Sequence, residues 1–260
     1  LADEDFRPGG RLNAETHEVD GMAAADWASA AVNELAAMDN VDLMTRTTVY
    51  GAFDHGVYGA LERKTDHLLS SDGKPRQVLW RIYSKRAILC AGSTERSIAF
   101  ANNDRPGVML AGAVRAYANR WGVAAGKRVT VLTNNDDGWN TARDLQAAGI
   151  DLAAVIDTRA ETTQGLTGVR TIAGQCVADT AGRKLIKSVT LTGGETVETD
   201  CLAIAGGWSP NVHLTCHQRG RPTWNDGIAG FVPGGDLPVG QHVAGAANGT
   251  MTLAAALADG

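Results

Sequence analysis

The sequence of 260 residues lacks any long run of apolar residues, any closely spaced cysteine pair, and any intact glycine-rich phosphate loop. No apolar run approaches the roughly 20 residues that a membrane-spanning helix requires. The first ten residues, LADEDFRPGG, contain neither the basic segment nor the apolar segment of a secretory signal peptide. We therefore expect a cytoplasmic protein that does not insert into a membrane.

The four cysteines, Cys90, Cys176, Cys201 and Cys216, are scattered, and no C-x-x-C or C-x₄-C pair occurs. This excludes the redox dithiol of disulfide reductases, and we interpret each cysteine as a small buried apolar residue. The segment HLTCH, residues 213–217, has no second pair of ligands elsewhere, as structural zinc would require. No metal site is predicted. No nucleophile elbow or other nucleophile–base arrangement is apparent either, so we assign no catalytic residue to this chain.

Composition and charge are those of an ordinary globular protein. Hydrophobic residues make up 44% and charged residues 20% of the chain. The 31 glycines, against only 7 prolines, suit an α/β protein with many tight turns. The net charge of −5 provides no basic surface of the kind that binds nucleic acid.

Strand and helix patterns alternate along the chain and are interrupted twice by antiparallel meanders. Residues 21–38 predict a helix, because Trp27, Ala31, Leu35 and Met38 fall on one helical face. The pattern as a whole predicts an α/β fold with two Rossmann-like dinucleotide-binding domains, each carrying a β-meander. We place the first domain at residues 1–104, an inserted second domain at 105–200, and a return to the first at 201–260.

Residues 129–145, VTVLTNNDDGWNTARDL, have the pattern of the strand, loop and helix that open a nucleotide-binding βαβ unit. Of the three glycines of G-x-G-x-x-G, only Gly138 is in place, and we predict that it permits close packing of helix on strand. Asp136 and Asp137 stand where a pyrophosphate would lie. There they would cap the helix and repel a phosphate. We predict that this loop binds no nucleotide and that Asp157, at the ribose-binding position, has lost its ligand.

The start of the chain has features of a first dinucleotide domain. Glu4 stands five residues before Gly9 and Gly10, where such folds place the acid that holds the ribose hydroxyls. An exposed acid at a strand end is an equally good interpretation, and both stay open. A phosphate loop should precede Glu4 by roughly 20 residues. We therefore expect this domain to lack its first strand and phosphate loop, as part of a longer polypeptide.

Near the other end, HVAGAANG fits the returning strand and glycine turn of a flavin-type domain. FAD-binding relatives have a Gly-Asp pair here, whereas this chain has Gly245 and Ala246. The alanine removes a polar contact to the flavin and argues against FAD. Asn248 offers a replacement donor or acceptor.

Five segments together resemble the α subunit of heterotetrameric sarcosine oxidase. They are ILCAGSTER, ANNDRPGVMLAGAVRAYANRWG, TNNDDGWNTARDL, AGGWSPN and VAGAANGTMTLAAALADG, and their order spans nearly the whole chain. The resemblance is to the FAD/NAD-type module in the middle of that subunit.

The resemblance implies a complex that oxidises sarcosine to glycine, produces hydrogen peroxide and passes a one-carbon unit to tetrahydrofolate. It implies FAD in the β subunit, FMN between α and β, and a tightly held NAD⁺ in the α module. The partners would be the β, γ and δ subunits, with the substrate bound on a partner. The NAD⁺ contacts would come from the first domain, at Glu4, Gly9, Gly10, Ala91, Gly92, Gly245, Ala246 and Asn248.

Two alternatives remain from the sequence. One is a self-sufficient FAD-dependent NAD(P)H oxidoreductase, the commonest activity of folds with two dinucleotide domains. The other is the large subunit of a related amine or opine dehydrogenase.

Overall fold

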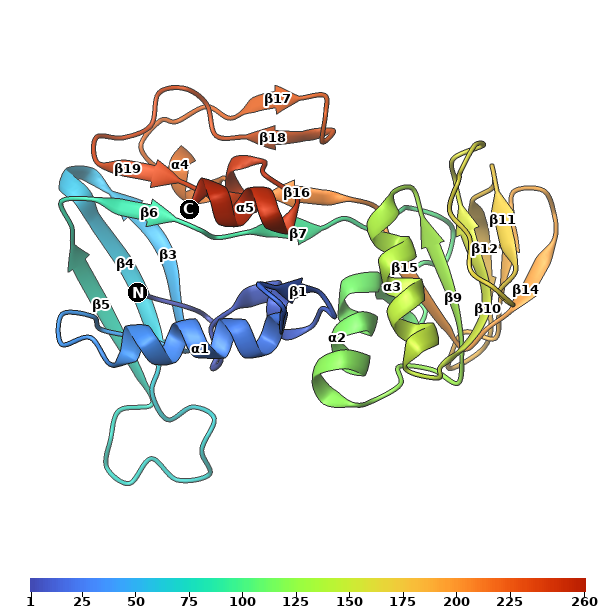
Figure 1. Ribbon diagram of the computed structural model, residues 1–260, viewed down its shortest axis with the longest axis horizontal. Helices are drawn as coiled ribbons and strands as arrows, with labels where there is room; N and C mark the ends of the chain where they lie inside the picture. Colours follow the sequence, from blue (N-terminus) through green and yellow to red (C-terminus); the bar gives the residue numbers. More distant parts are fainter. The chain divides into compact units, whose positions relative to one another are not determined.

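The computed structural model describes all 260 residues, which form two compact units (Figure 1). Unit 1 comprises residues 1–10, 26–94 and 208–260, and unit 2 comprises residues 11–25 and 95–207. None of the helices combines the length and the apolar character needed to cross a membrane.

Unit 2 is built on one parallel sheet of five strands. In spatial order the strands are β11 (Thr171–Ala173), β10 (Asp151–Asp157), β9 (Arg128–Thr133), β15 (Cys201–Ala205) and β8 (Val108–Leu110). Every neighbouring pair runs parallel. Helix α2 (Ala111–Trp121) follows β8, and α3 (Asp136–Ala147) connects β9 to β10. This is the strand–helix–strand alternation predicted from the sequence.

The sheet is buried on both faces, which is typical of parallel sheets. Helices α2 and α3 cover one face, where Val131 of β9 packs with the fully buried Trp139 of α3 (Figure 1). The other face packs on an antiparallel meander of β12 (Val177–Ala181), β13 (Ser188–Leu191) and β14 (Thr196–Glu198). Here Leu132, the next residue of β9, contacts the cluster that contains Val189. The side chains of successive residues in a strand thus pack on opposite faces of the sheet.

The units differ from the predicted domains in three segments. Strand β15, assigned to the first domain by the boundary at 201, lies inside the sheet of unit 2 between β9 and β8. Its five residues are all buried, which is expected of a strand in the centre of a parallel sheet. Residues 95–104 and 11–25 also belong to unit 2. The latter include all but the first residue of the 3₁₀ turn η1 (Gly10–Asn13) and the hairpin of β1 (Glu18–Val19) and β2 (Met22–Ala23).

Unit 1 contains the other predicted meander, formed by β3 (Thr47–Phe53), β4 (Val57–Arg63) and β5 (Gln77–Tyr83). Two parallel pairings lie beside it. Strand β6 (Ala87–Leu89) pairs with β19 (Gln241–Val243), and residues 1–5 run alongside 44–47 through the bridge of Ala2 with Met44. A Rossmann-like sheet in this unit stays a prediction.

The remaining elements are short except for one. Helix α1 (Ala24–Ala36) lies within the predicted helical segment. The others are η2 (Asp54–Gly56), β7 (Ser93–Glu95), β16 (Trp208–Pro210), α4 (His213–Cys216), β17 (Thr223–Asn225), β18 (Gly230–Val232), η3 (Gly245–Asn248) and α5 (Leu253–Asp259).

Gly138 holds α3 close to the sheet. A Cβ atom at this position would lie 2.3 Å from Thr133 Oγ1 and 3.1 Å from Ala205 Cβ. No side chain therefore fits between the first turn of α3 and the ends of β9 and β15. This confirms the packing role predicted for the single retained glycine of the loop.

We expect Gly138→Ala to lower the free energy of unfolding by about 1–3 kcal/mol, the usual cost of overpacking a close contact. Urea unfolding followed by tryptophan fluorescence would measure it. Gly165→Ala is the matched control, because a Cβ there meets nothing within 4 Å. Equal stabilities of the two variants would contradict this account of Gly138.

Candidate dinucleotide-binding sites

The loop between β9 and α3 is closed by its own polar groups. Asn135 has an extended backbone (φ −152°, ψ 172°), and its side-chain oxygen accepts the Asp137 N–H at 2.9 Å. Its side-chain amide donates to the Ala205 carbonyl at 2.9 Å, and Thr133 Oγ1 donates to the Asn135 carbonyl at 2.8 Å. Thr133 and Asn135, which stand at the positions of the two missing glycines of G-x-G-x-x-G, therefore brace the turn.

The prediction that Asp136 and Asp137 cap α3 is wrong, because the N-cap residue is Asn135. The cap is the last residue with extended backbone, and its side chain reaches the N–H two residues further on. Asp136 and Asp137 are the first two residues of the helix proper.

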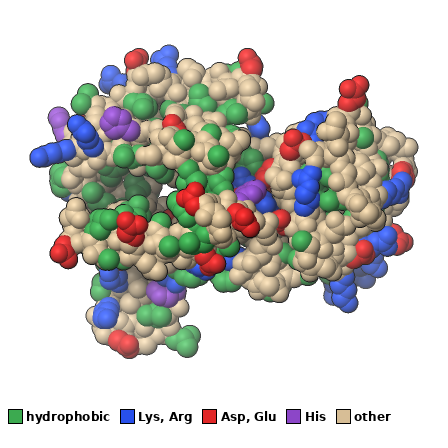
Figure 2. All heavy atoms as spheres, viewed as in Figure 1, with side chains coloured by type: hydrophobic (Ala, Val, Ile, Leu, Met, Phe, Trp, Pro, Cys, Tyr) green, Lys and Arg blue, Asp and Glu red, His purple; other side chains and the backbone are tan.

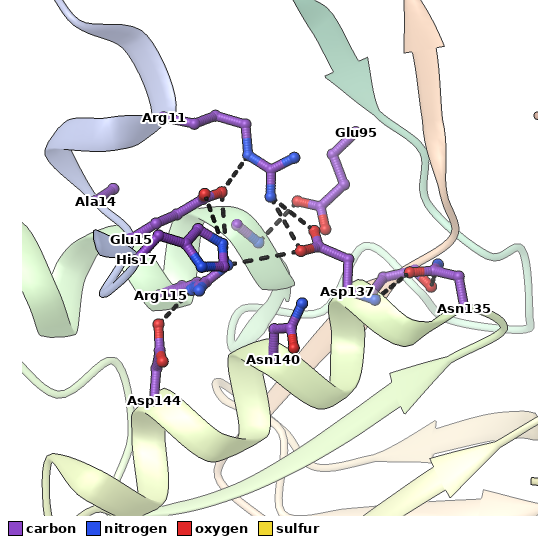
Figure 3. A network of polar contacts seen from close by, with 12 residues as sticks. Arg11, Ala14, Glu15, His17, Glu95, Arg115, Asn135, Asp137, Asn140 and Asp144 are labelled. Carbon is purple, nitrogen blue, oxygen red and sulfur yellow. Dashed lines mark hydrogen bonds and ion pairs between the residues drawn. The ribbon is translucent and has the colours of Figure 1, made fainter. Parts of the chain in front are cut away.

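Both aspartates form ion pairs with arginines instead. Arg11 donates to both carboxylate oxygens of Asp137 from the same nitrogen, at 3.0 and 2.9 Å (Figure 3). Arg159 Nη2 donates to Asp136 Oδ1 at 2.9 Å. Carboxylates stabilise the positive end of a helix, and these two already occupy that end together with the arginines that could otherwise hold a phosphate there. The geometry supports the prediction that this loop takes no nucleotide.

A buried network ties residues 11–17 to α2 and α3. Arg115, only 2% exposed, bonds through Nε to Asp144, and its Nη1 lies 3.5 Å from Glu15 Oε1 and 3.6 Å from Asp137 Oδ1 (Figure 3). Thr16 Oγ1 donates to Asp144 Oδ1 at 2.7 Å. Removing one member of such a buried pairing is costly, because it leaves its partner charged and unpaired.

Glu95 stands beside this network with an unusual pKa. Its Oε2 accepts the Gly112 N–H at the start of α2 at 2.8 Å, whereas its buried Oε1 has no hydrogen-bond partner. Burial raises the pKa of Glu95 to about 7, and the charge of Asp137 adds to the rise. The Gly112 N–H and the charges of Arg11 and Arg115 oppose it.

Asp157, at the predicted ribose-binding position of unit 2, already has protein partners. Its carboxylate is fully buried, and it accepts from Trp139 Nε1 at 2.8 Å and from Arg159 Nη2 at 2.8 Å. Burial alone would raise the pKa of Asp157, but these hydrogen bonds outweigh it and lower the pKa. This supports the prediction that Asp157 has lost its ligand.

In unit 1, the pairing of β6 with β19 brings two predicted glycine turns together. The two strands are parallel, with Leu89 opposite Val243, so their carboxyl ends lie at one edge. Ala91 and Gly92 follow β6, and their carbonyls accept from the side chain and backbone of Asn211 at 2.7 and 3.0 Å.

The second turn, η3, begins two residues after β19. It contains Gly245, Ala246 and Asn248, all three of which were predicted as site residues. A carboxylate from α5 holds this turn. Asp259 Oδ2 accepts from Gly245 N–H at 2.8 Å, from Asn248 Nδ2 at 3.4 Å and from Thr250 Oγ1 at 3.3 Å.

Three of the predicted site glycines of unit 1 leave open space where a side chain at Gly138 would clash. A Cβ at Gly10 or Gly92 would meet nothing within 4 Å, and one at Gly245 would meet only Ala256 Cβ at 3.8 Å. All three have left-handed φ, between +53° and +68°, which favours glycine. Their backbones are thus accessible to the close approach that a dinucleotide makes.

Glu4 lies elsewhere in unit 1, just beyond the bridge of Ala2 with Met44. Its side chain is exposed, and its carbonyl accepts from Arg63 Nη2 at 2.7 Å. Gly9 follows with φ +129°. The structure thus puts Glu4 on a different parallel pairing from β6 and β19, with Gly9 and Gly10 following it in the chain, and a shared ligand stays a prediction.

Asn211 and Asp259 were not identified from the sequence. Asp259 carried one signal, since a carboxylate at the carboxyl end of a helix is disfavoured by the helix dipole unless something else holds it. The interpretation of each cysteine as a small buried apolar residue is right for Cys201, which is buried. It is wrong for Cys90, which is exposed directly after β6. The structure contains no group of three or more His, Cys, Asp or Glu residues suited to a metal ion.

Comparison with known proteins confirms the predicted resemblance. Over its full length the chain is 43% identical to sarcosine oxidase subunit alpha of Rhizobium meliloti (strain 1021) and 39% identical to that of Corynebacterium sp. (strain U-96). It spans only 27% and 29% of the length of these relatives. No family model matches the chain.

Two solved structures share the fold. L-proline dehydrogenase from P. horikoshii superposes with a TM-score of 0.75 at 21% identity, covering 95% of this chain and 45% of that one. Thioredoxin reductase from T. acidophilum gives 0.72 at 13% identity, covering 99% of this chain and 85% of that one. At these identities the likeness is one of fold, the α/β dinucleotide-binding fold of oxidoreductases.

We expect Glu95→Gln to remove a pH dependence of stability. The pKa of Glu95 is about 7 in the folded chain and about 4.3 when unfolded, so the folded chain binds the extra proton between these values. The free energy of unfolding of the wild type should therefore fall as pH rises through this range.

The glutamine variant should match the wild type near the low end of this range and exceed it by about 1–3 kcal/mol above the folded pKa. Chemical denaturation across the range would measure the difference. Glu161→Gln, on the exposed surface, is the control. A wild-type profile that is flat, or that Glu95→Gln leaves unchanged, would refute the assignment.

Proposed function

From the similarity of the whole chain to one segment of sarcosine oxidase alpha subunits, we propose that it is the NAD⁺-binding and scaffold region of such a subunit. The observation that carries the proposal is the contrast between the two glycine loops. The turns at Gly92 and Gly245 are open, whereas the turn at Gly138 is filled by Thr133 and Ala205. One dinucleotide, bound in unit 1, agrees with the open turns there and with the filled turn in unit 2.

In this proposal the turns at the carboxyl ends of β6 and β19 approach the dinucleotide. Asn248 supplies a polar side chain, and Glu4 binds the ribose hydroxyls, for which two acceptor oxygens match two vicinal donors. Asp259 accepts the Gly245 N–H at 2.8 Å, so a ligand would contact this turn through other atoms or take over that hydrogen bond. We assign the phosphate-binding loop to the longer polypeptide, since the relatives are several times the length of this chain.

The same reasoning places the flavins elsewhere in the complex. Ala246 stands where FAD-binding domains use an aspartate, so unit 1 offers one polar contact fewer to a flavin. We propose that FAD lies on the β subunit and FMN between α and β, where sarcosine is oxidised to glycine with formation of hydrogen peroxide. The one-carbon unit would pass to tetrahydrofolate, and γ and δ subunits would complete the assembly.

Specific likenesses favour each alternative. The fold shared with L-proline dehydrogenase favours the large subunit of an amine or opine dehydrogenase, and that shared with thioredoxin reductase favours a self-sufficient FAD-dependent NAD(P)H oxidoreductase. The self-sufficient enzyme would need a second nucleotide at the loop of unit 2. There Asp136 and Asp137 are paired with arginines, which opposes that alternative.

The nucleotide released from the full-length protein on denaturation tests the proposal. We expect close to one NAD⁺ per subunit, identified by mass and absorbance, and no NADH oxidation by the isolated subunit. FAD released from that subunit, together with NADH oxidation, would overturn the proposal.

Paired variants test which unit binds NAD⁺. Glu4→Gln should lower the NAD⁺ content of the purified protein, because it removes one of two acceptors for the ribose hydroxyls. Asp157→Asn changes the corresponding residue of unit 2 and should leave the content unchanged in the folded fraction. The reverse pattern would assign the nucleotide to unit 2.

A further inference from the structure

Unit 1 contains a hollow of about 410 Å³ beside the amino ends of β6 and β19. The predicted NAD⁺ site lies at the carboxyl ends of the same strands. Lys85 lines the hollow two residues before β6 begins, and Val239 lines it two residues before β19 begins. Gly92 and Gly245, by contrast, follow the carboxyl ends of the same strands. The hollow is therefore separate from the predicted NAD⁺ site.

Close backbone contacts fix the walls of this hollow. A Cβ at Gly56 would lie 2.3 Å from the Ser84 carbonyl oxygen, and one at Gly240 would lie 2.6 Å from that of Lys85. Both glycines have left-handed φ, +70° and +80°. Ser84 N–H donates to the Gly56 carbonyl at 2.9 Å, and Ala87 N–H donates to the Gly240 carbonyl at 2.8 Å. Three chain segments are thus locked together, and the hollow exists before any ligand binds.

The lining carries basic side chains and no acidic one. Lys85 and His55 are both exposed at its rim. Figure 2 shows basic and histidine side chains gathered at the left edge of unit 1, where the amino ends of β6 and β19 lie in Figure 1. An ammonium group and an imidazole, free of a competing carboxylate in the lining, form a site for a negatively charged group.

One lining residue, Tyr58, belongs to a buried polar pair. Tyr58 is 7% exposed, and its hydroxyl oxygen accepts from Gln241 Nε2 at 3.0 Å, which leaves the hydroxyl hydrogen to donate. Gln241 is 4% exposed, and its Oε1 has no hydrogen-bond partner. Pro238 and Val239 add apolar surface to the same hollow. A few polar groups set in partly apolar walls, at this volume, are typical of small-molecule sites.

We propose that this hollow binds a small organic oxyanion. Its phosphate or carboxylate would be held by Lys85 and His55, and its apolar part would lie against Pro238 and Val239. The site is independent of the NAD⁺ proposal, because it uses none of the same residues.

Isothermal titration of the full-length protein with phenyl phosphate, and separately with benzoate, tests the inference. We expect saturable binding of one probe molecule per chain at physiological chloride concentration. Binding of phenyl phosphate alone would identify a phosphate as the recognised group, and binding of benzoate alone a carboxylate. Binding of both would support a site that accepts either a phosphate or a carboxylate. Failure of both probes to bind would overturn the proposal.

Variants locate the binding. Lys85→Met should weaken it about tenfold or more, since it removes a charge-assisted contact, and His55→Ala should weaken it by removing a ring N–H donor. Lys74→Met, which removes an exposed lysine outside the hollow, should leave it unchanged. Equal affinity in Lys85→Met and wild type would overturn the proposal. The NAD⁺ content of Lys85→Met should stay at the wild-type level, which separates this test from that of the proposed function.

Discussion

The ion pairs of Asp136 and Asp137 with Arg159 and Arg11 close the loop at the start of α3 in unit 2. A helix that begins at the carboxyl edge of a parallel sheet offers its positive end to an anion. In this chain the anions are carboxylates of the helix itself. They are held by arginines 23 and 126 residues away in sequence. The buried Arg115 extends the network inward to Asp144, so the closed loop is continuous with the packing of α2 on α3.

The loop of unit 2 is thus closed, and the open turns predicted to bind a nucleotide lie in unit 1. Its turns at Gly92 and Gly245 have left-handed φ and leave space for a ligand, whereas the turn at Gly138 is filled by Thr133 and Ala205. In the proposed account the chain keeps one nucleotide site, in unit 1, and uses the βαβ unit of unit 2 as a packed scaffold. Fold likeness alone does not separate these roles, and the residues at each loop do.

Local sequence was sufficient to predict the structure wherever a residue pattern repeats over a few positions. The strand before Thr133, the helix after it and the packing role of Gly138 were predicted, because periodicity and one glycine determine them. The choice of Asn135 over the aspartates as cap depends on where the backbone turns helical, which sequence locates only to within a few residues. Partners distant in the chain, such as Arg11 for Asp137 and Asp259 for Gly245, leave no local pattern. Residues 11–25 were misplaced for that reason.

The central claim is that the dinucleotide is bound by unit 1 and excluded from unit 2. Photolabelling of the full-length protein with an azido-adenine analogue of NAD⁺, followed by mapping of the modified peptides, tests it most directly. The account predicts label in the segments around Glu4, Gly92 and Gly245, with competition by unmodified NAD⁺. Label in the peptides that contain Asn135 or Asp157 would contradict it.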